Sequence, residues 1–221
     1  MIVTIDGPAG AGKSTAARRL AERLGFVFLD TGALYRAVAL AARRAGLDRD
    51  AAEPALEGLL ATLHIDYELG PGRVSLGGED VTGPIRAPEV TALTGRVADS
   101  PAVRARLTAL QRQVAAAAAG RPLVTEGRDQ GTLVFPDAAC KFFLTADPQE
   151  RARRRHAELV RRGPDVPLAE VRAAQDERDA RDTARAIAPL VPAGDAIHVD
   201  TTGLGVDAVV DLLEGHVRRR L

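Results

Sequence analysis

The sequence is poor in several residue types, and each shortage argues against a class of protein. It holds a single cysteine, Cys140, so the chain cannot form an internal disulfide and a reducing cytoplasm is the expected setting. No stretch of about 18 apolar residues occurs, so no membrane span is expected. The apolar run after Met1 ends at Ile5, before a proline and glycines, so we expect no signal peptide.

An excess of charge of one sign is lacking as well. Thirty basic and thirty acidic residues cancel, which leaves no global field to attract nucleic acid or a membrane surface. Aromatic residues are few and tryptophan is absent, so the core must rest on aliphatic side chains. We expect a single unit spanning residues 1–221, a monomer whose partners are small molecules.

Lysine and asparagine are the most informative shortages. Only Lys13 and Lys141 are lysines among the thirty basic residues, and asparagine does not occur at all. A lysine in such an arginine-rich chain is a candidate for chemistry that needs a compact ammonium charge, which fits Lys13. Lys141 is expected to be a surface charge at a strand end. The lack of asparagine argues against a GTPase, whose base-reading N-K-x-D motif needs one.

Hydrophobic periodicity and turn residues predict an α/β protein with a parallel sheet and crossover helices. Strands are expected at residues 1–5, 26–29, 123–126, 141–144 and 196–199. The first helix is expected to end at about residue 24. Further helices are expected at about residues 31–45, 102–119 and 168–185. Two more are expected to begin at residue 148 and at about residue 206, and residues 161–167 interrupt the one that begins at 148.

Residues from about 62 to 100 break this order. Short strand-like runs occur at 64–69, 73–76 and 79–82, and the last two flank Gly77-Gly78, a two-residue hairpin signal. We expect a small antiparallel patch inserted into the α/β fold, with a decorated loop as the alternative.

The segment between the first strand and the first helix matches G-x-x-x-x-G-K-[ST] without a mismatch. Backbone N–H groups of such a loop converge on phosphate oxygens, and the helix N-terminus adds its dipole. Lys13 can reach the β- and γ-phosphates, and the Ser14 hydroxyl can bind Mg²⁺ together with phosphates and waters. The predicted ATP-binding residues of the loop are Gly7, Pro8, Ala9, Gly10, Ala11, Gly12, Lys13, Ser14 and Thr15.

The alternative is a glycine-rich turn before an amphipathic helix. The small size favours a metabolite kinase over a motor ATPase.

Two further loops follow predicted strands at the same edge of the sheet, where ligands bind in open α/β folds. After the second strand, Thr31 offers a hydroxyl, and Tyr35 and Arg36 lie one helical turn further on. After the third strand, Arg128 beside Asp129 can bind a phosphate and a hydrogen-bond donor together. The alternatives are that Thr31 only caps its helix and that Arg128 and Asp129 form a surface ion pair.

Arginines also gather on two neighbouring helices. Residues Arg178, Arg181, Asp182 and Arg185 fall on one helical face, and Arg151 and Arg155 lie one turn apart. The two sets flank a Pro- and Gly-containing segment, which suits a lid at about residues 151–170. Closure of a lid would bring positive charge to the transferring phosphoryl group and exclude water. The alternative is a pair of solvated charged faces.

Five motifs occur in order along the chain: IDGPAGAGKST, LDTGALYR, GEDVT, EGRDxGTxVFPDA and RDARDTARAIAPL. In these motifs the chain resembles the bacterial cytidylate kinases from end to end. The resemblance implies the P-loop nucleoside monophosphate kinase fold, with a five-stranded parallel sheet, an inserted monophosphate-binding subdomain at about residues 62–100 and an arginine-bearing lid. It also implies phosphoryl transfer from ATP to CMP or dCMP with Mg²⁺, in pyrimidine nucleotide metabolism.

The resemblance further implies roles at matching positions. The substrate-binding residues are Thr31, Tyr35, Arg36, Arg104, Arg128, Asp129, Arg178, Asp182 and Arg185. Thr31, Arg104 and Asp129 look like base or nucleoside contacts. Arg36, Arg128 and Arg185 look like contacts to the acceptor phosphate. Arg178 and Asp182 look like ribose or phosphate contacts. Arg151 and Arg155 look like lid residues facing ATP. The catalytic set is Lys13, Arg128, Arg155 and Arg185.

Two positions depart from the family pattern. Gln130 stands where an apolar residue is usual, and its amide can alter base contacts beside Asp129. Gly95 stands where the family often has a serine near the cytosine, and Thr94 or water is the candidate substitute.

Two rival functions stay open at this point. One is a P-loop kinase for another small acceptor, such as UMP, AMP or shikimate. The other is a nucleotide-binding regulatory or nucleic-acid module that uses the arginine-rich stretch 151–162, although the neutral overall charge opposes it. In the favoured reaction the acceptor phosphate is already a nucleophilic anion, so catalysis needs alignment and charge neutralisation more than a strong base.

Overall fold

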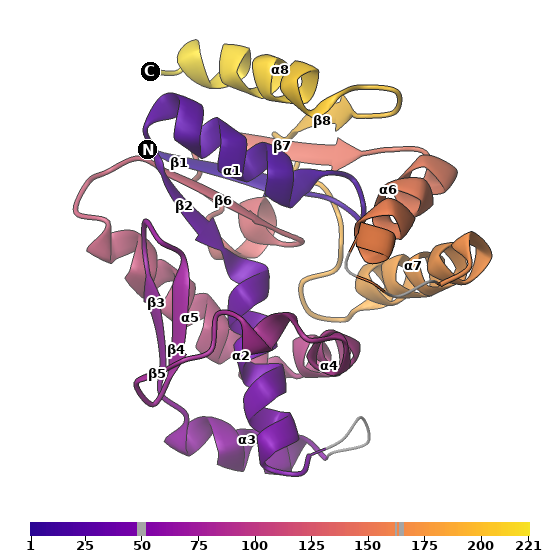
Figure 1. Cartoon of the computed structure of the whole chain (residues 1–221). Helices are drawn as coiled ribbons and strands as arrows, with labels where there is room; N and C mark the ends of the chain where they lie inside the picture. The colour runs from indigo at the N-terminus through magenta and orange to yellow at the C-terminus, as the bar shows by residue number, and fades with distance from the viewer. Residues whose placement is uncertain (48–51, 162, 164–165) are drawn as a thin grey trace. The chain divides into compact units, whose positions relative to one another are not determined.

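A computed structural model of the chain describes residues 1–47, 52–161, 163 and 166–221. The chain divides into two compact units (Figure 1). The first comprises Met1–Phe26 and Val124–Leu221, and the second comprises Val27–Leu123. Each unit has its own core of fully buried aliphatic side chains, such as Ile5 and Leu144 in the first and Leu34 and Leu107 in the second.

Five short strands form the main sheet, as the sequence predicts. They are β1 (Ile2–Asp6), β2 (Val27–Asp30), β6 (Leu123–Gly127), β7 (Cys140–Thr145) and β8 (Ile197–Asp200), in the order β2-β6-β1-β7-β8. β1 pairs with β7, and β7 with β8, in parallel. β1 and β7 are buried along most of their length because helices cover both faces of a parallel sheet. The loops that carry the candidate site follow the carboxyl ends of β1 and β6.

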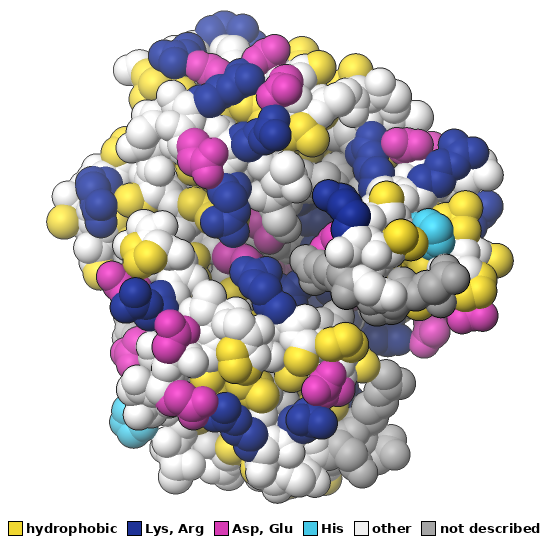
Figure 2. All heavy atoms as spheres, in the orientation of Figure 1, with side chains coloured by type: hydrophobic (Ala, Val, Ile, Leu, Met, Phe, Trp, Pro, Cys, Tyr) yellow, Lys and Arg dark blue, Asp and Glu magenta, His cyan; other side chains and the backbone are white. Residues whose placement is uncertain are grey.

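The helices of the first unit begin and end near the predicted residues. α1 (Lys13–Leu24) stops at Gly25, whose φ of +67° suits a left-handed C-cap. It packs against α8 (Val206–Arg218), and Arg19 and Arg23 of α1 form exposed ion pairs with acidic residues of α8. In Figure 2 basic and acidic side chains adjoin at the top of the view, where these helices run. Exposed pairs of this kind contribute little stability.

Two arginine-bearing helices, α6 (Pro148–Arg161) and α7 (Leu168–Ala184), pack on each other in the first unit. Both were predicted. Three residues of the interruption predicted at 161–167, namely 162, 164 and 165, lie outside the described residues.

The second unit contains more helix than predicted. α2 (Thr31–Arg44) and α5 (Pro101–Ala117) match the sequence prediction, whereas α3 (Glu53–Thr62) and α4 (Pro88–Asp99) were not predicted. Both begin with proline at N1 or N2, a position that suits a helix start, and each contains one glycine that weakens the helical pattern.

The antiparallel patch is confirmed as a three-stranded sheet of β3 (Ile65–Glu68), β4 (Arg73–Leu76) and β5 (Glu79–Asp80). Gly77 and Gly78 form the turn between β4 and β5 with positive φ values of 54° and 86°. β5 is shorter than the predicted run 79–82. A short 3₁₀ turn, η1 (Pro84–Arg86), follows it.

Two details of the first unit differ from expectation. The loop after β6 contains a π-helical turn, η2 (Gln130–Val134). Lys141 was predicted to be a surface charge, and this is wrong: its side chain is 9% exposed and its Nζ lies 2.9 Å from Oδ1 of Asp195. Lys141 sits in β7 opposite Thr4 of β1, and its ion-pair partner Asp195 has an exposed side chain. No helix among the described residues is both long and apolar enough to span a bilayer.

Candidate active site

The loop between β1 and α1 has the backbone that phosphate binding requires. Gly7, Gly10 and Gly12 adopt φ values of 144°, 77° and 85°, which residues with a Cβ rarely adopt. A Cβ at Gly7 would lie 2.0 Å from the carbonyl oxygen of Leu144, and one at Gly10 would lie 2.7 Å from Nε2 of Gln175. The predicted loop therefore tolerates no side chain at its first and second glycines.

Lys13 is held inside this loop. Its Nζ donates a 2.7 Å hydrogen bond to the carbonyl of Pro8, and its side chain is buried. Burial, together with the positive charges of Arg128 and Arg178, lowers the pKa of Lys13 to about 7, while Glu126 opposes that shift. The ammonium therefore lies in an environment where an added anion would stabilise its charged form.

Ser14 is paired with a carboxylate from another strand end. Its Oγ donates a 2.8 Å hydrogen bond to Oε1 of Glu126, which is buried at the end of β6. Glu126 was read from the sequence only as part of a motif, and no local signal indicated that it would reach the phosphate loop. The pair places a hydroxyl and a carboxylate, both hard oxygen ligands, beside each other.

Asp6 joins β1 to the loop after β6. Its Oδ1 accepts from the backbone N–H of Gln130 at 2.9 Å, and its Oδ2 accepts from that of Gly131 at 2.8 Å. Burial, against the effect of these two hydrogen bonds, raises the pKa of Asp6 to about 6, and the nearby Asp129 charge adds to the rise. Asp6 thereby fixes the start of η2, which follows directly after Arg128 and Asp129.

Asp182 organises the arginines predicted to bind substrate in this unit. Its Oδ2 accepts from Nε of Arg128 at 3.0 Å and lies 4.0 Å from Nε of Arg178, and its Oδ1 accepts from Nη2 of Arg185 at 2.5 Å. Burial would raise the pKa of Asp182, but the three guanidinium groups outweigh it and hold that pKa below its usual range. The structure thus gathers Arg128, Arg178 and Arg185 around one carboxylate.

The other predicted lid arginines lie on α6. Arg151 is buried, and its Nη1 donates to the carbonyl of Ala9 at 3.0 Å and pairs with Asp179. Asp179 also accepts from the backbone N–H of Ala9 at 3.1 Å. Arg155 instead pairs with Glu158 on its own helix at 2.8 Å. Arg151 therefore touches the phosphate loop in this structure, and Arg155 contacts its helical neighbour.

A further arginine near the loop was not predicted. Arg154 donates to Oγ1 and to the carbonyl of Thr201, at 2.9 and 2.7 Å, and Thr201 donates to the carbonyl of Ala11 at 3.3 Å. A Cβ at Gly12 would lie 3.9 Å from Nη1 of Arg154. Arg154 on α6 and Thr201, the residue directly after β8 (Ile197–Asp200), together support the loop, a contact with no signal in the local sequence.

In the second unit, Asp30 at the end of β2 caps α2. Its Oδ1 accepts from the backbone N–H of Ala33 at 3.0 Å, and its Oδ2 accepts from Nη2 of Arg86 at 3.2 Å. Asp30 is therefore the N-cap, and Thr31 is the first residue of the helix, so the alternative that Thr31 only caps its helix is wrong.

The other residues predicted for substrate in this unit lie on α2 and α5. The guanidinium of Arg104 lies over the Tyr35 ring, 5.7 Å from its centroid, in cation–π geometry. A Cβ at Gly32 would lie 3.2 Å from Nη1 of Arg36, so that guanidinium folds back over the start of α2.

The two departures from the family pattern have different surroundings. Gln130 is fully buried: Thr125 donates to its Oε1 at 3.0 Å, and its Nε2 lies 3.4 Å from Oδ1 of Asp129. Thr94, the candidate substitute beside Gly95, donates to the carbonyl of Val90 in its own helix at 2.8 Å. The donor capacity of Thr94 is thus used within α4.

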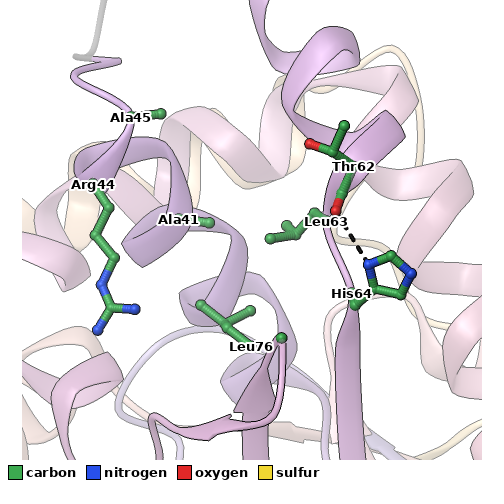
Figure 3. A pocket seen from close by; sticks show the side chains of 8 residues that line it. Ala41, Arg44, Ala45, Thr62, Leu63, His64 and Leu76 are labelled. Carbon is green, nitrogen blue, oxygen red and sulfur yellow. Dashed lines mark hydrogen bonds between the residues drawn. The ribbon is translucent and has the colours of Figure 1, made fainter.

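The second unit also holds an open pocket of about 430 Å³, apart from all of these residues (Figure 3). Its apolar lining residues are Ala41, Ala45, Leu63 and Leu76, and His64 also lines it, with Nδ1 3.2 Å from the carbonyl of Thr62. Arg44, also in its wall, is held by Glu79 through two hydrogen bonds of 2.7 and 2.8 Å. None of the predicted site residues lines this pocket.

Comparison with solved structures gives the fold alone. An uncharacterized protein from Eubacterium ventriosum superposes with a TM-score of 0.55 at 14% identity, covering 100% of this chain and 99% of that chain. A protein from Thermus thermophilus superposes with a TM-score of 0.51 at 17% identity, covering 100% and 97%.

Sequence comparison is more specific. A cytidylate kinase of Geobacter sulfurreducens is 49% identical over 224 residues, which cover 100% of this chain and 94% of that protein. A bifunctional pantoate ligase/cytidylate kinase of a Synechococcus species is 50% identical over 224 residues, which cover 100% of this chain and 45% of that protein. The sequence model of the family described as cytidylate kinase matches residues 3–219. On this match and these identities, the chain belongs to the cytidylate kinase family.

Proposed function

We propose that the chain transfers the γ-phosphoryl group of ATP to CMP or dCMP, giving ADP and CDP or dCDP. One observation carries the proposal: the ammonium of Lys13 is buried inside a glycine-rich loop, 2.7 Å from the carbonyl of Pro8, and the positive charges of Arg128 and Arg178 act on it. Such a concentration of positive charge is costly alone and favourable around polyphosphate. The setting would be pyrimidine nucleotide metabolism in the cytoplasm, and the partners small molecules.

The donor phosphates would bind at residues 7–15. The N–H groups there and the ammonium of Lys13 would supply hydrogen-bond donors for the β- and γ-phosphates, and the positive φ values of the glycines support close approach of the phosphates. Arg151 and Arg155 would contact the same nucleotide from α6. Lys13 and Arg155 would neutralise charge that develops on the transferring group.

The acceptor phosphate would bind to the arginines that Asp182 gathers. Arg128 and Arg185 would neutralise the phosphate, with Arg178 and Asp182 on the ribose or phosphate. An oxygen of the acceptor phosphate attacks the γ-phosphorus, the bond to the β,γ-bridging oxygen breaks, and ADP leaves with the electron pair. The attacking oxygen is already anionic, so alignment and charge neutralisation replace a strong base.

In the first unit, Asp129 is retained as a proposed nucleoside-binding residue. In the second unit, the proposed substrate-binding residues are Thr31, Tyr35, Arg36 and Arg104. We retain residues 62–100 as the inserted subdomain and 151–170 as the lid; residues 162 and 164–165 of that lid lie outside the described residues.

Mg²⁺ fits the residues around Ser14. The hydroxyl of Ser14 and the carboxylate of Glu126, 2.8 Å apart, are oxygen ligands of the kind Mg²⁺ prefers. No group of three or more His, Cys, Asp or Glu side chains that could hold a metal occurs among the described residues. We propose that phosphates and waters complete the coordination of the ion. When bound, the ion would screen the charge of the β- and γ-phosphates; Ser14 would hold it and Glu126 would orient Ser14.

A panel of acceptors in a coupled ADP-release assay tests this function. CMP and dCMP are expected to give the highest kcat/KM, and UMP, AMP and shikimate much lower values. A preference for AMP or shikimate would overturn the cytidylate assignment and leave the phosphate loop intact. No ADP release with any acceptor, together with nucleic-acid binding of steep salt dependence, would support a binding module instead.

A further inference from the structure

One face of α7 lies against the phosphate loop. Oδ1 of Asp179 accepts from the backbone N–H of Ala9 at 3.1 Å, and Asp179 also pairs with Arg151, whose Nη1 donates to the carbonyl of Ala9. Gln175 lies four residues before Asp179, so it shares this face. A Cβ at Gly10 would lie 2.7 Å from Nε2 of Gln175, which puts that amide directly on the loop.

The amide of Gln175 is buried and unsatisfied. The residue is 6% exposed, and neither Nε2 nor Oε1 has a hydrogen-bond partner among the described residues. Native proteins keep few such groups, because an unpaired buried amide costs stability that an apolar side chain of the same size would not. An unpaired amide at this place indicates that a bound ligand supplies its hydrogen-bond partner.

The groups around Gln175 indicate the chemistry of that ligand. Nε2 is a donor only, so its partner must offer an acceptor oxygen. Gly10, which it touches, belongs to the loop whose N–H groups face phosphate, and Arg151 and Lys13 bring positive charge to the same loop. Phosphate oxygens are acceptors and anions, and they fit both conditions.

We propose that Gln175 donates from Nε2 to a phosphate oxygen of the donor nucleotide, as a further phosphate-binding residue. The inference rests on the proposed function, which takes a nucleoside triphosphate to this loop. A neutral amide adds a hydrogen-bond donor without adding to the positive charge around Lys13, whose pKa burial and Arg128 already lower. The amide thereby strengthens binding of the donor nucleotide without adding to the charge repulsion around Lys13.

The test compares Gln175→Leu with the matched control Gln113→Leu, which replaces an exposed glutamine on α5. Calorimetry measures the Kd of a non-hydrolysable ATP analogue, of inorganic tripolyphosphate and of CMP. Gln175→Leu is expected to raise the first two Kd values about tenfold, as loss of a hydrogen bond to a charged group does, and to leave that of CMP unchanged. The Tm of Gln175→Leu is expected to stay unchanged or to rise. Gln175→Glu is expected to weaken the binding of the ATP analogue and of tripolyphosphate further.

Three results would overturn the assignment. Kd values for the analogue and tripolyphosphate within twofold of wild type would show that the amide binds no phosphate. A change with the analogue but not with tripolyphosphate would place the amide on the nucleoside, and a change with CMP alone would place it on the acceptor.

The readout stays usable if Gln175→Leu does not fold, because Gln175→Met removes the amide with an unbranched side chain. It is also independent of the acceptor. A wild-type protein that binds the ATP analogue but transfers nothing to CMP would contradict the proposed function without touching the role of Gln175.

Discussion

Oγ of Ser14 donates a 2.8 Å hydrogen bond to Oε1 of Glu126, across 112 residues of sequence. The serine lies in the first turn of α1 and the glutamate is the second-last residue of β6, so the bond fixes the phosphate loop to the neighbouring strand end. It also orients the one hydroxyl proposed to bind Mg²⁺. The charge of Glu126 also opposes the lowering of the pKa of Lys13, so one buried carboxylate acts on both Lys13 and Ser14.

Replacing Glu126 by glutamine should therefore weaken the response to Mg²⁺. The amide keeps an acceptor for Ser14 but loses the charge, and removal of a residue that orients a metal ligand costs about 10- to 100-fold in metal affinity or activity. The Mg²⁺ concentration for half-maximal rate is expected to rise at least tenfold. Ser14→Ala should move it in the same direction and Ser14→Thr should not. An unchanged Mg²⁺ dependence in Glu126→Gln would contradict this role.

Lys13→Ala should remove most transition-state stabilisation at the loop. The expected loss is roughly 3–4 kcal/mol, or two to three orders of magnitude in kcat/KM, comparable to losing an oxyanion-hole donor. Lys141→Met is the matched control, because it removes the other lysine, which is buried and paired with Asp195. The control should lower the free energy of unfolding and leave kcat within about twofold. Near wild-type turnover of Lys13→Ala would refute the assignment.

Asp182→Asn should release the arginines proposed to bind the acceptor phosphate. Breaking a buried ion pair from one side costs about 3–5 kcal/mol of stability, and the KM for CMP is expected to rise at least tenfold. The surface pair of Arg172 and Asp176, 3.6 Å apart on the same helix, offers the control. Asp176→Asn should change stability by less than about 1 kcal/mol and leave KM unchanged.

The same substitution has a pH signature. The pKa of Asp182 is lower in the folded chain than in the unfolded chain, so its contribution to stability is present above the unfolded pKa near 4 and disappears as pH falls through the folded value. The difference in unfolding free energy between wild type and Asp182→Asn should therefore shrink on acidification. A difference that stays constant down to pH 2–3 would contradict the charge-based account.

The strands, the phosphate loop and the hairpin could be predicted because their signals are local. A short run rich in apolar residues, the glycine spacing and the Gly77-Gly78 turn each determine the backbone next to them. α3 and α4 were missed because single glycines and flanking prolines obscure short helices, and Lys141 was misread because its burial depends on strand neighbours far away in the sequence.

The candidate site was predicted in part for the same reason. The loop residues and the arginine face of α7 follow from spacing within one element. Glu126, Asp179 and Gln175 reach the loop only through tertiary contacts, and the Asp179–Ala9 hydrogen bond spans 170 residues. No periodicity or motif indicates such a contact, so the part that these three residues play in the site can be seen only in the structure.

Asp6 supplies a second pH-dependent prediction of opposite sign. Its pKa is raised from 3.8 to about 6 by burial, so the folded chain holds this proton more tightly than the unfolded chain does. The stability that Asp6 contributes is therefore fully present below pH about 4 and is lost as pH rises through about 6. Two pKa units correspond to about 3 kcal/mol.

Asp6→Asn removes that titration, although it also replaces one of two acceptors for the N–H groups of Gln130 and Gly131 and so lowers stability at every pH. The informative quantity is the pH dependence of the difference from wild type. Urea unfolding between pH 4 and 7 should show the wild type losing about 3 kcal/mol relative to Asp6→Asn. A difference independent of pH would mean that Asp6 stays ionised throughout, with its two backbone hydrogen bonds outweighing the cost of burial.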